Sequence, residues 1–200
     1  MNQNIKIPFV DLYPQYEELK SEIDLAIRDI ITRSDYITGP TVEKFEQAIM
    51  NYTGAEACAS IGSGTNALVC ALKALDIGPG HQVMTVGHTF VSTTEAIVNV
   101  GATPVFVDID QFYHLDVNKM ELTDTLKAIL FVDLYGQTPD VDKILSFAKQ
   151  FNLKVIEDAA QSFGSEYKGK KVGSVADLTC FSFNPVKNLS LIHISEPTRL

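Results

Sequence analysis

The pattern of apolar and polar residues divides the chain into a helical first quarter and an alternating remainder. In the first quarter, apolar side chains recur at three- and four-residue steps, which is the period of an amphipathic helix. This period predicts one helix over Pro14–Arg33 and a second helix that carries Val42, Phe45, Ile49 and Tyr52 on one face. The chain is therefore expected to begin with two helices that each have an apolar and a polar face.

From residue 55 onward, short apolar runs alternate with stretches of helical periodicity. The expected strands are Ala57–Ile61, Gln82–Val86, Pro104–Val107, Ala128–Leu134, Lys154–Glu157 and Leu178–Phe183. The expected helices are Thr65–Leu75, Ser92–Val100 and Val141–Phe151. This alternation predicts an α/β fold with three layers, α/β/α, in which helices cover both faces of a mostly parallel sheet.

Composition excludes several classes of protein. Of the 200 residues, 46% are hydrophobic and 20% are charged, as in globular domains with a sizeable core. Sixteen Lys and Arg oppose 25 Asp and Glu, and the net charge of −9 disfavours binding to nucleic-acid phosphates or to an anionic membrane surface. No apolar run is long enough for a membrane span. The three cysteines are unclustered and odd in number, which favours buried thiols in a cytoplasmic protein.

Ligands of parallel sheets bind at the carboxyl ends of the strands, so the residues after each apolar run are the candidates for chemistry. Residues 62–66, Gly-Ser-Gly-Thr-Asn, lead from an expected strand into an expected helix. Free N–H groups and the helix dipole could hold a phosphate there. The same segment is also consistent with a plain turn in which Ser63 or Thr65 caps the helix.

Three further strand ends carry an aromatic ring, an acid and a lysine. Phe90 can lie flat on a planar ligand or pack in the core. Asp158 needs a compensating partner if it is buried, and its alternative is to cap a following helix. Lys187 can be a nucleophile in a sheltered site or an ordinary surface side chain. Each of these signals is weak when taken singly.

In combination and in this order, the four features are what pyridoxal phosphate needs. Its phosphate needs a helix N-terminus, its ring a flat neighbour, its pyridine nitrogen a carboxylate and its aldehyde a lysine amine. Two other candidates are interpreted as structural. Residues 169–173, Gly-Lys-Lys-Val-Gly, are typical of a solvated hairpin turn, and Asp108 and Asp110 are expected in a strand-end turn. We therefore predict a pyridoxal-phosphate site and no metal site.

Seven motifs strengthen this prediction. They are Tyr36-Ile-Thr-Gly-Pro40, Ser63-Gly-Thr-Asn-Ala-Leu68, Gly78-Pro-Gly80, His88-Thr-Phe-Val-Ser-Thr93, Leu134-Tyr-Gly-Gln137, Glu157-Asp-Ala-Ala-Gln161 and Phe181-Ser-Phe-Asn-Pro-Val-Lys-Asn-Leu189. From Ile7 to about Leu189 the chain thereby resembles the DegT/DnrJ/EryC1/StrS family of sugar aminotransferases. The resemblance implies the aspartate-aminotransferase fold, which is fold type I of the pyridoxal-phosphate enzymes. One departure is Asp133, which stands where the family often has histidine.

The resemblance also implies a role for each matching residue. Lys187 would bind the cofactor aldehyde and then move the proton, and Asp158 would pair with the pyridine nitrogen. Gln161 would contact the ring hydroxyl, Phe90 would stack on the ring, and the segment Tyr36–Pro40 would lie near the nucleotide-sugar entrance. The cofactor phosphate would be held by Gly64, Thr65 and Ser182.

The activity that the resemblance implies is transfer of an amino group, with glutamate as donor, to a keto sugar linked to a nucleotide. Polysaccharide or O-antigen biosynthesis in the cytoplasm, by a homodimer, is the implied setting. Two alternatives stay open. One is a pyridoxal-phosphate-dependent sugar dehydratase of the same family, a branch in which histidine replaces the anchoring lysine. The other is a non-enzymatic regulatory member.

A boundary is expected at residue 189. We expect residues 1–189 to form an N-terminal segment and an incomplete large domain that binds pyridoxal phosphate. In the family, a glycine-rich run and a smaller C-terminal domain follow at this point, whereas residues 190–200 resemble neither. We therefore expect residues 190–200 to be a non-native tail, the small domain to be absent, and the chain to be an inactive fragment.

Overall fold

The computed structural model describes residue 8 and residues 10–188. The expected tail at residues 190–200 and the expected boundary at residue 189 lie outside the described residues.

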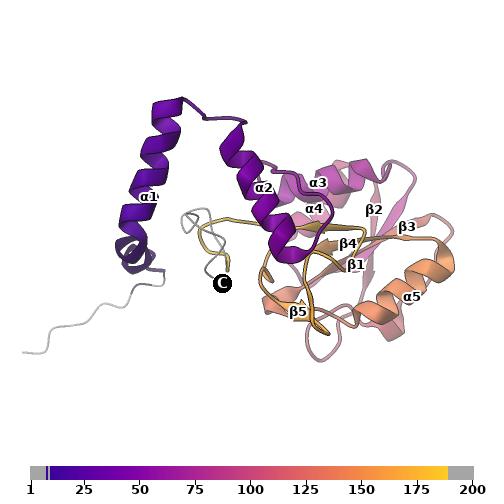
Figure 1. Cartoon of the computed structure of the whole chain (residues 1–200). Coiled ribbons are helices and arrows are strands. Elements are labelled where there is room, and N and C mark those ends of the chain that lie inside the picture. The colour runs from indigo at the N-terminus through magenta and orange to yellow at the C-terminus, as the bar shows by residue number, and fades with distance from the viewer. Residues whose placement is uncertain (1–7, 9, 189–200) are drawn as a thin grey trace, which may run out of the picture.

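Two helices precede the sheet, as the apolar periodicity predicts. They are α1 (Tyr13–Arg33) and α2 (Pro40–Thr53). Helix α2 buries Ile49 and Thr53, whereas α1 has no buried residue and stands away from the sheet domain (Figure 1). The apolar stripe of α1 is therefore present, but the described part of the chain does not cover it.

A five-stranded parallel sheet forms the centre of the remaining chain. Its strands are β1 (Gln82–Val86), β2 (Thr103–Val107), β3 (Leu126–Val132), β4 (Lys154–Asp158) and β7 (Leu178–Cys180). Their order is β2-β1-β3-β4-β7, and each neighbouring pair is parallel. Strands β1, β3 and β4 are buried along almost their whole length, which explains the consecutive apolar residues in β1 and β3, whereas β4 also carries the buried acids Glu157 and Asp158.

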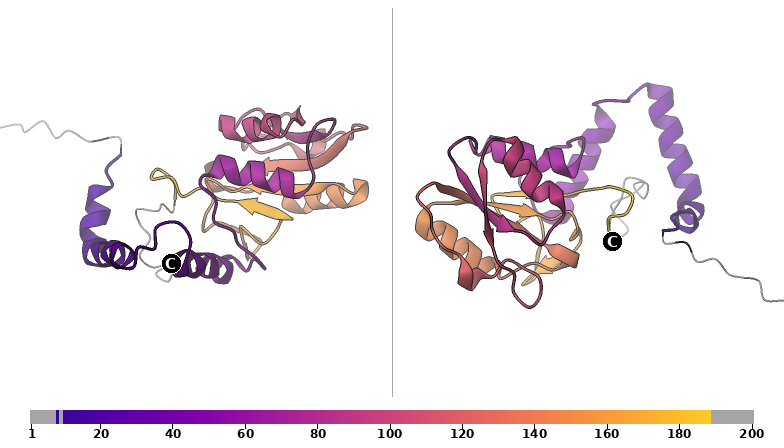
Figure 2. Two further views of the ribbon diagram at one scale, coloured as in Figure 1. Left: turned by 90° about the horizontal axis from the view of Figure 1, so that it is seen from above. Right: turned by 180° about the vertical axis from the view of Figure 1, so that it is seen from behind.

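Helices cover both faces of this sheet. Helices α3 (Gly64–Ala74) and α4 (Val91–Asn99) lie together on one face, and α5 (Val141–Phe151) packs against β3 and β4 on the other (Figures 1 and 2). The three layers of the predicted α/β/α fold are confirmed. Each strand–helix connection runs past the carboxyl end of a strand, so the loops gather at one edge of the sheet.

The hairpin expected at residues 169–173 is present, but its turn lies earlier, because Lys170 and Lys171 form its second strand and Val172 is buried. Strands β5 (Glu166–Tyr167) and β6 (Lys170–Lys171) form an antiparallel hairpin. Its turn, Lys168 and Gly169, has φ angles of 50° and 79°, as a tight hairpin requires. Two single-turn 3₁₀ helices, η1 (Val117–Lys119) and η2 (Leu134–Gly136), complete the described elements.

One predicted strand is wrong. Residues Ala57–Ile61 are not in a strand, and most of them are exposed. A strand needs a neighbour for its backbone hydrogen bonds, and within the described residues this segment pairs with none. Instead, the backbone N–H of Ser60 donates to Oε1 of Glu46 at 2.6 Å. The last strand is also shorter than expected, because it ends at Cys180 rather than Phe183.

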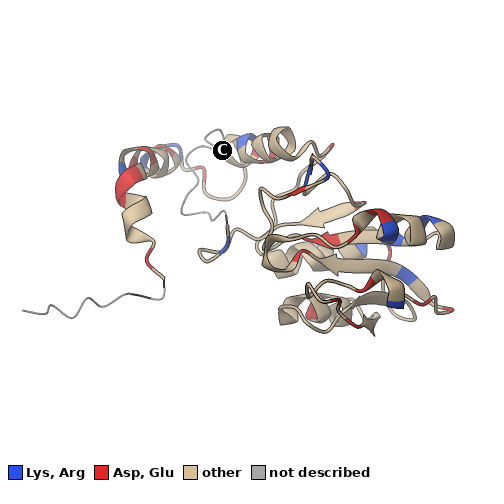
Figure 3. Cartoon of the chain, turned by 90° about the horizontal axis from the view of Figure 1, so that it is seen from below, with Lys and Arg blue, Asp and Glu red and all other residues tan. Residues whose placement is uncertain are grey.

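The expectation of buried thiols holds only in part. All three cysteines are free, but only Cys180 is buried, whereas Cys58 is half-buried and Cys70 is exposed on α3. Basic and acidic residues are interspersed along the ribbon (Figure 3). Among the described residues, none of the helices combines the length and the apolar character that a membrane crossing needs.

Candidate active site

A pocket of ≈ 410 Å³ lies at the carboxyl ends of the strands. All the residues predicted for the cofactor site line it, although they come from four separate parts of the chain. The loop after β1 carries Phe90, and the start of α3 carries the first phosphate candidates. The segments after β4 and β7 provide the others. The predicted residues in the pocket are Gly64, Thr65, Phe90, Asp158, Gln161, Ser182 and Lys187.

The N-terminus of α3 forms one wall of the pocket. Ser63 is the N-cap, and its hydroxyl accepts a hydrogen bond from the N–H of Asn66 at 3.2 Å. A Cβ on Gly64 would lie 3.0 Å from Cβ of Ser182, so glycine allows the helix to begin this close to the segment after β7. The N–H groups of a first helical turn lack partners within the helix. The capping interpretation is therefore confirmed for Ser63, and the other N–H groups of this turn stay without a partner inside the helix.

Asp158 is a buried carboxylate on the floor of this pocket, only 6% exposed. Its Oδ2 accepts a hydrogen bond from the Thr93 hydroxyl at 2.8 Å, and its Oδ1 accepts one from the N–H of Ala160 at 3.3 Å. A turn rather than a helix follows it, so the capping alternative is wrong. Burial raises the pKa of Asp158, and these two hydrogen bonds and the positive charge of Lys187 oppose that rise.

Phe90 and Lys187 face each other across the pocket. The Phe90 side chain is 65% exposed, so the alternative of core packing is wrong. The Lys187 Nζ lies 6.0 Å from the centre of the Phe90 ring. An exposed aromatic face beside an amine is the arrangement that accepts a flat ring carrying an electrophilic carbon.

Gln161 has one end of its amide already occupied. Its Oε1 accepts a hydrogen bond at 2.9 Å from the N–H of Tyr135, a residue with a φ angle of 57°. This bond leaves the Nε2 group as the donor that Gln161 can offer to a ligand oxygen.

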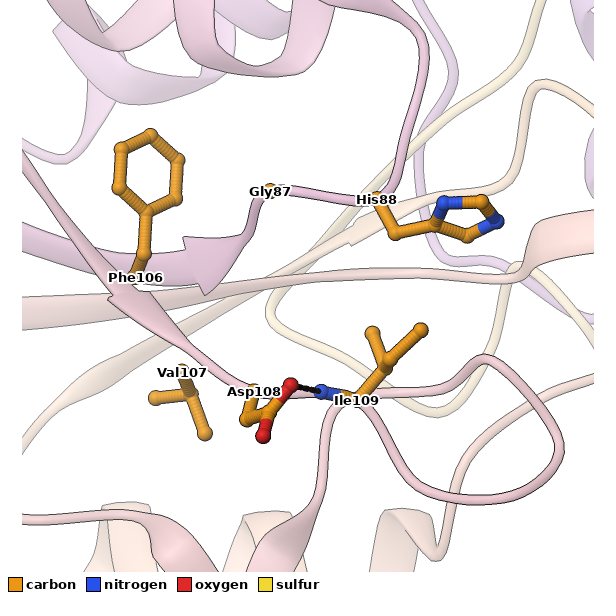
Figure 4. Close-up of a pocket in the computed structure, with 6 residues that line it drawn as sticks. All are labelled: Gly87, His88, Phe106, Val107, Asp108 and Ile109. Atoms are coloured by element: carbon orange, nitrogen blue, oxygen red, sulfur yellow. Dashed lines mark hydrogen bonds between the residues drawn. The ribbon is translucent and has the colours of Figure 1, made fainter.

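A smaller pocket of ≈ 320 Å³ lies beside the first, between the ends of β1 and β2 (Figure 4). Its lining includes Asp108, whose Oδ1 accepts from the N–H of Ile109 at 2.9 Å and whose Oδ2 accepts from Lys119. Asp110 accepts hydrogen bonds from two further backbone N–H groups. Both aspartates are therefore turn residues, as the sequence predicts.

Sequence reasoning assigned no role to the hydroxyl groups beneath the pocket. Thr93 is fully buried and donates to Asp158. Ser92 accepts a hydrogen bond from Thr65 at 2.8 Å, and Thr89 contacts Thr93 at 2.9 Å. The available signal was three consecutive hydroxyl residues, Ser92, Thr93 and Thr94, at the start of α4. Such residues usually cap the helix, and their partners are distant in sequence.

The comparisons with known proteins agree with this geometry. The model of the DegT/DnrJ/EryC1/StrS aminotransferase family matches residues 17–192. The chain belongs to this family. The resemblance to the family's sequences is thereby confirmed, and the solved structures below confirm the predicted aminotransferase fold.

Two curated relatives show the extent of the similarity. The UDP-2-acetamido-2-deoxy-3-oxo-D-glucuronate aminotransferase of Pseudomonas aeruginosa is 43% identical over 186 residues, which cover 92% of this chain and 52% of that protein. The UDP-N-acetyl-3-dehydro-alpha-D-glucosamine 3-aminotransferase of Acidithiobacillus ferrooxidans is 42% identical over 192 residues, or 94% of this chain and 52% of that protein. The chain thus spans about half the length of the curated relatives it matches.

Solved structures have the same fold. DesV of S. venezuelae, crystallised in complex with a ketimine intermediate, superposes with a TM-score of 0.90 at 37% identity, covering 92% of this chain and 51% of that one. NtdA of Bacillus subtilis, with bound cofactor PMP, gives a TM-score of 0.87 at 33% identity, covering 94% and 44%.

The buried bond between Thr93 and Asp158 gives a testable prediction. In the full-length protein, Thr93→Val should lower the free energy of unfolding by about 1–3 kcal/mol at neutral pH, because a buried carboxylate oxygen loses its donor. Without that bond the already raised pKa of Asp158 rises further. The folded state then binds its proton more tightly than the unfolded state does, so the destabilisation should shrink as the pH falls through this pKa. Denaturant unfolding of the wild type and the variant at several pH values measures this difference in the free energy of unfolding.

Thr89→Val is the matched control, because Thr89 contacts Thr93 but not Asp158. Its effect should be smaller and should not depend on pH in the same range. Equal, pH-independent losses in both variants would contradict the assigned role of Thr93.

Proposed function

We propose that this chain provides the cofactor-binding part of a pyridoxal-phosphate-dependent aminotransferase. The full-length enzyme would transfer an amino group from glutamate to a keto sugar linked to a nucleotide. The observation that carries the proposal is the placement of Asp158, Phe90 and Lys187 around one pocket that begins at a helix N-terminus. The named relatives, which are aminotransferases of nucleotide-linked sugars, support the substrate class.

The residues present fit pyridoxal phosphate. At the start of α3, close to Ser182, the helix dipole, the backbone N–H groups of Gly64 and Thr65 and the hydroxyl of Ser182 suit a phosphate, whereas the Thr65 hydroxyl already donates to Ser92. The exposed ring of Phe90 suits a flat aromatic partner. Asp158 has few donors for a buried carboxylate, and a protonated ring nitrogen would supply another. When bound, the cofactor supplies an electron sink.

Each residue then has a definite task. Lys187 holds the cofactor through its amine and moves a proton to and from the reacting carbon, as general base and then acid. Asp158 keeps a proton at the pyridine nitrogen, because its carboxylate is fixed by Thr93 and Ala160. The Nε2 group of Gln161 donates to the ring oxygen.

The two alternatives have less support. A dehydratase of this family would carry histidine in place of Lys187, and a regulatory protein would not need Lys187 and Asp158 in one pocket. The biosynthetic setting stays a prediction, which we place in cytoplasmic polysaccharide or O-antigen biosynthesis. One relative, the spore coat polysaccharide biosynthesis protein SpsC of Bacillus subtilis, is 43% identical over 155 residues.

The test of the function is amino transfer by the full-length protein, because this chain covers only half of its relatives. Incubation with pyridoxal phosphate and L-glutamate should release 2-oxoglutarate. Lys187→Ala should lower the rate by about 10²–10⁴-fold and should abolish the absorption band of lysine-bound cofactor. Lys168→Ala is the control, because Lys168 is exposed and pairs with Asp142 away from the pocket.

Two results would contradict the proposal. Turnover and an unchanged band in Lys187→Ala would remove Lys187 from the mechanism. Sugar conversion by the wild-type protein without any 2-oxoglutarate from glutamate would favour the dehydratase.

We also propose that the full-length protein is a homodimer. The support is α1, whose Ile27 and Ile31 lie one turn apart and are 52% and 55% exposed. Exposed apolar stripes of this kind mark surfaces that a partner covers. Light scattering should give a dimer for the wild type and for the polar-face control Glu18→Ala. The double variant Ile27→Asp, Ile31→Asp should shift the population to monomer, and a monomeric wild type would contradict the proposal.

A further inference from the structure

Two acids that the proposed chemistry does not use are buried next to Asp158. Asp133 follows β3 and Glu157 lies in β4, and both are fully inaccessible to solvent. Consecutive residues of a strand point to opposite faces, so Glu157 points away from its neighbour Asp158. The contacts agree, because Asp158 meets Thr93 of α4, whereas Glu157 meets Thr179 of β7. A second acidic layer therefore lies behind the floor of the pocket.

In this second layer, one oxygen of each carboxylate accepts hydrogen bonds and the other oxygen has no donor among the described residues. Oε2 of Glu157 accepts from the Thr179 hydroxyl at 2.7 Å and from the N–H of Gly173 at 3.3 Å. Oδ2 of Asp133 accepts from the Ser162 hydroxyl at 2.8 Å. The remaining oxygens, Oδ1 of Asp133 and Oε1 of Glu157, are buried and have no donor among the described residues. The side chains of Asp133 and Glu157 lie within hydrogen-bonding reach of each other. Two neighbouring buried carboxylates, each with one oxygen unpartnered, would be strongly unfavourable if both were charged.

We propose that Asp133 and Glu157 share one proton, carried by Asp133, and that this acid pair is a positioning element for the segment that bears Asp158. A single O–H donated from Asp133 to Glu157 gives both unpartnered oxygens a hydrogen bond and halves the buried charge. Glu157 is the better charged partner because it already accepts two hydrogen bonds, whereas Asp133 accepts one.

The electrostatics support this assignment. Burial raises the pKa of Asp133 well above its usual value, and the negative charge of Glu157 raises it further. Burial also raises the pKa of Glu157, but hydrogen bonds from Thr179 and Gly173 oppose that rise. Two other titratable groups lie near the pair: Asp158 on β4 and Cys180 on β7. Burial raises the pKa of the Cys180 thiol to about 12, so it stays neutral.

The positioning role follows from what the pair connects. Asp133 donates its backbone N–H to the carbonyl of Asp158 at 3.1 Å, and its side chain accepts from Ser162. Glu157 joins β4 to β7 through Thr179. The shared proton would therefore connect the residue after β3 to β4, next to Asp158 and the turn that carries Gln161. That the two acids share a proton is inferred from the fold alone. That the pair positions Asp158 for catalysis rests on the proposed function.

Infrared spectroscopy of the full-length protein tests the proton directly. At neutral pH the wild type should show the carbonyl band of a protonated carboxyl group, and the band should shift when aspartate is labelled with ¹³C. Asp133→Asn and Glu157→Gln should each lose the band, the second because the new amide donates to Asp133 and allows it to ionise. Asp76→Asn, at an exposed turn, and Asp158→Asn should both retain it.

The spectrum of the ¹³C-labelled wild type shows whether Asp133 is protonated even if a variant does not fold. A missing band, a band that shifts only with labelled glutamate, or one that is lost in Asp158→Asn would overturn the proposal. A second readout is thermal stability against pH. Because a raised carboxyl pKa makes stability fall as the pH rises through it, the melting temperature of Asp133→Asn should fall less steeply than that of the wild type. Formation of 2-oxoglutarate, measured in the same samples, separates failure of this inference from failure of the proposed function.

Discussion

The rest of the site depends on the burial of one carboxylate at the tip of a central parallel strand. Asp158 ends β4 with 6% of its surface exposed, in a place where a charge must be compensated. Thr93 reaches it because α4 packs beside β1, and Ala160 reaches it because a turn rather than a helix follows. These donors fix the carboxylate in orientation and leave it facing the pocket, where a protonated ring nitrogen would complete its coordination.

Much of this arrangement could be predicted from the sequence, because the strands of a parallel sheet all point in the same direction. Once strands and helices alternate, the strand ends must meet at one edge. Phe90, Asp158 and Lys187 could therefore be expected together despite their separation in the chain, and the structure places them in one pocket. Relative positions of this kind follow from the apolar periodicity and from the order of the motifs.

Features that depend on a specific neighbour could not be predicted in this way. The apolar pattern of Ala57–Ile61 is that of a strand, but pairing is a property of two segments, and this one pairs with none that the structure describes. The role of Thr93 depends on a contact across 65 positions of the chain. Asp133 departs from the family pattern, but the proposed role of this residue depends on its burial beside Glu157 and on the hydrogen bonds of that acid. In the proposed arrangement the acids thus form two layers, with Asp158 facing the pocket and, behind it, the pair of Asp133 and Glu157 that shares one proton.

The proposed function requires Asp158 to be a charged carboxylate that holds a proton on the ring nitrogen of bound pyridoxal phosphate. The most direct measurement is the ¹⁵N chemical shift of that nitrogen in the full-length protein loaded with ¹⁵N-labelled cofactor. The shift of a protonated pyridine nitrogen is expected for the wild type, and Asp158→Asn should move it toward the unprotonated value. An unprotonated nitrogen in the wild-type protein at neutral pH would contradict the account.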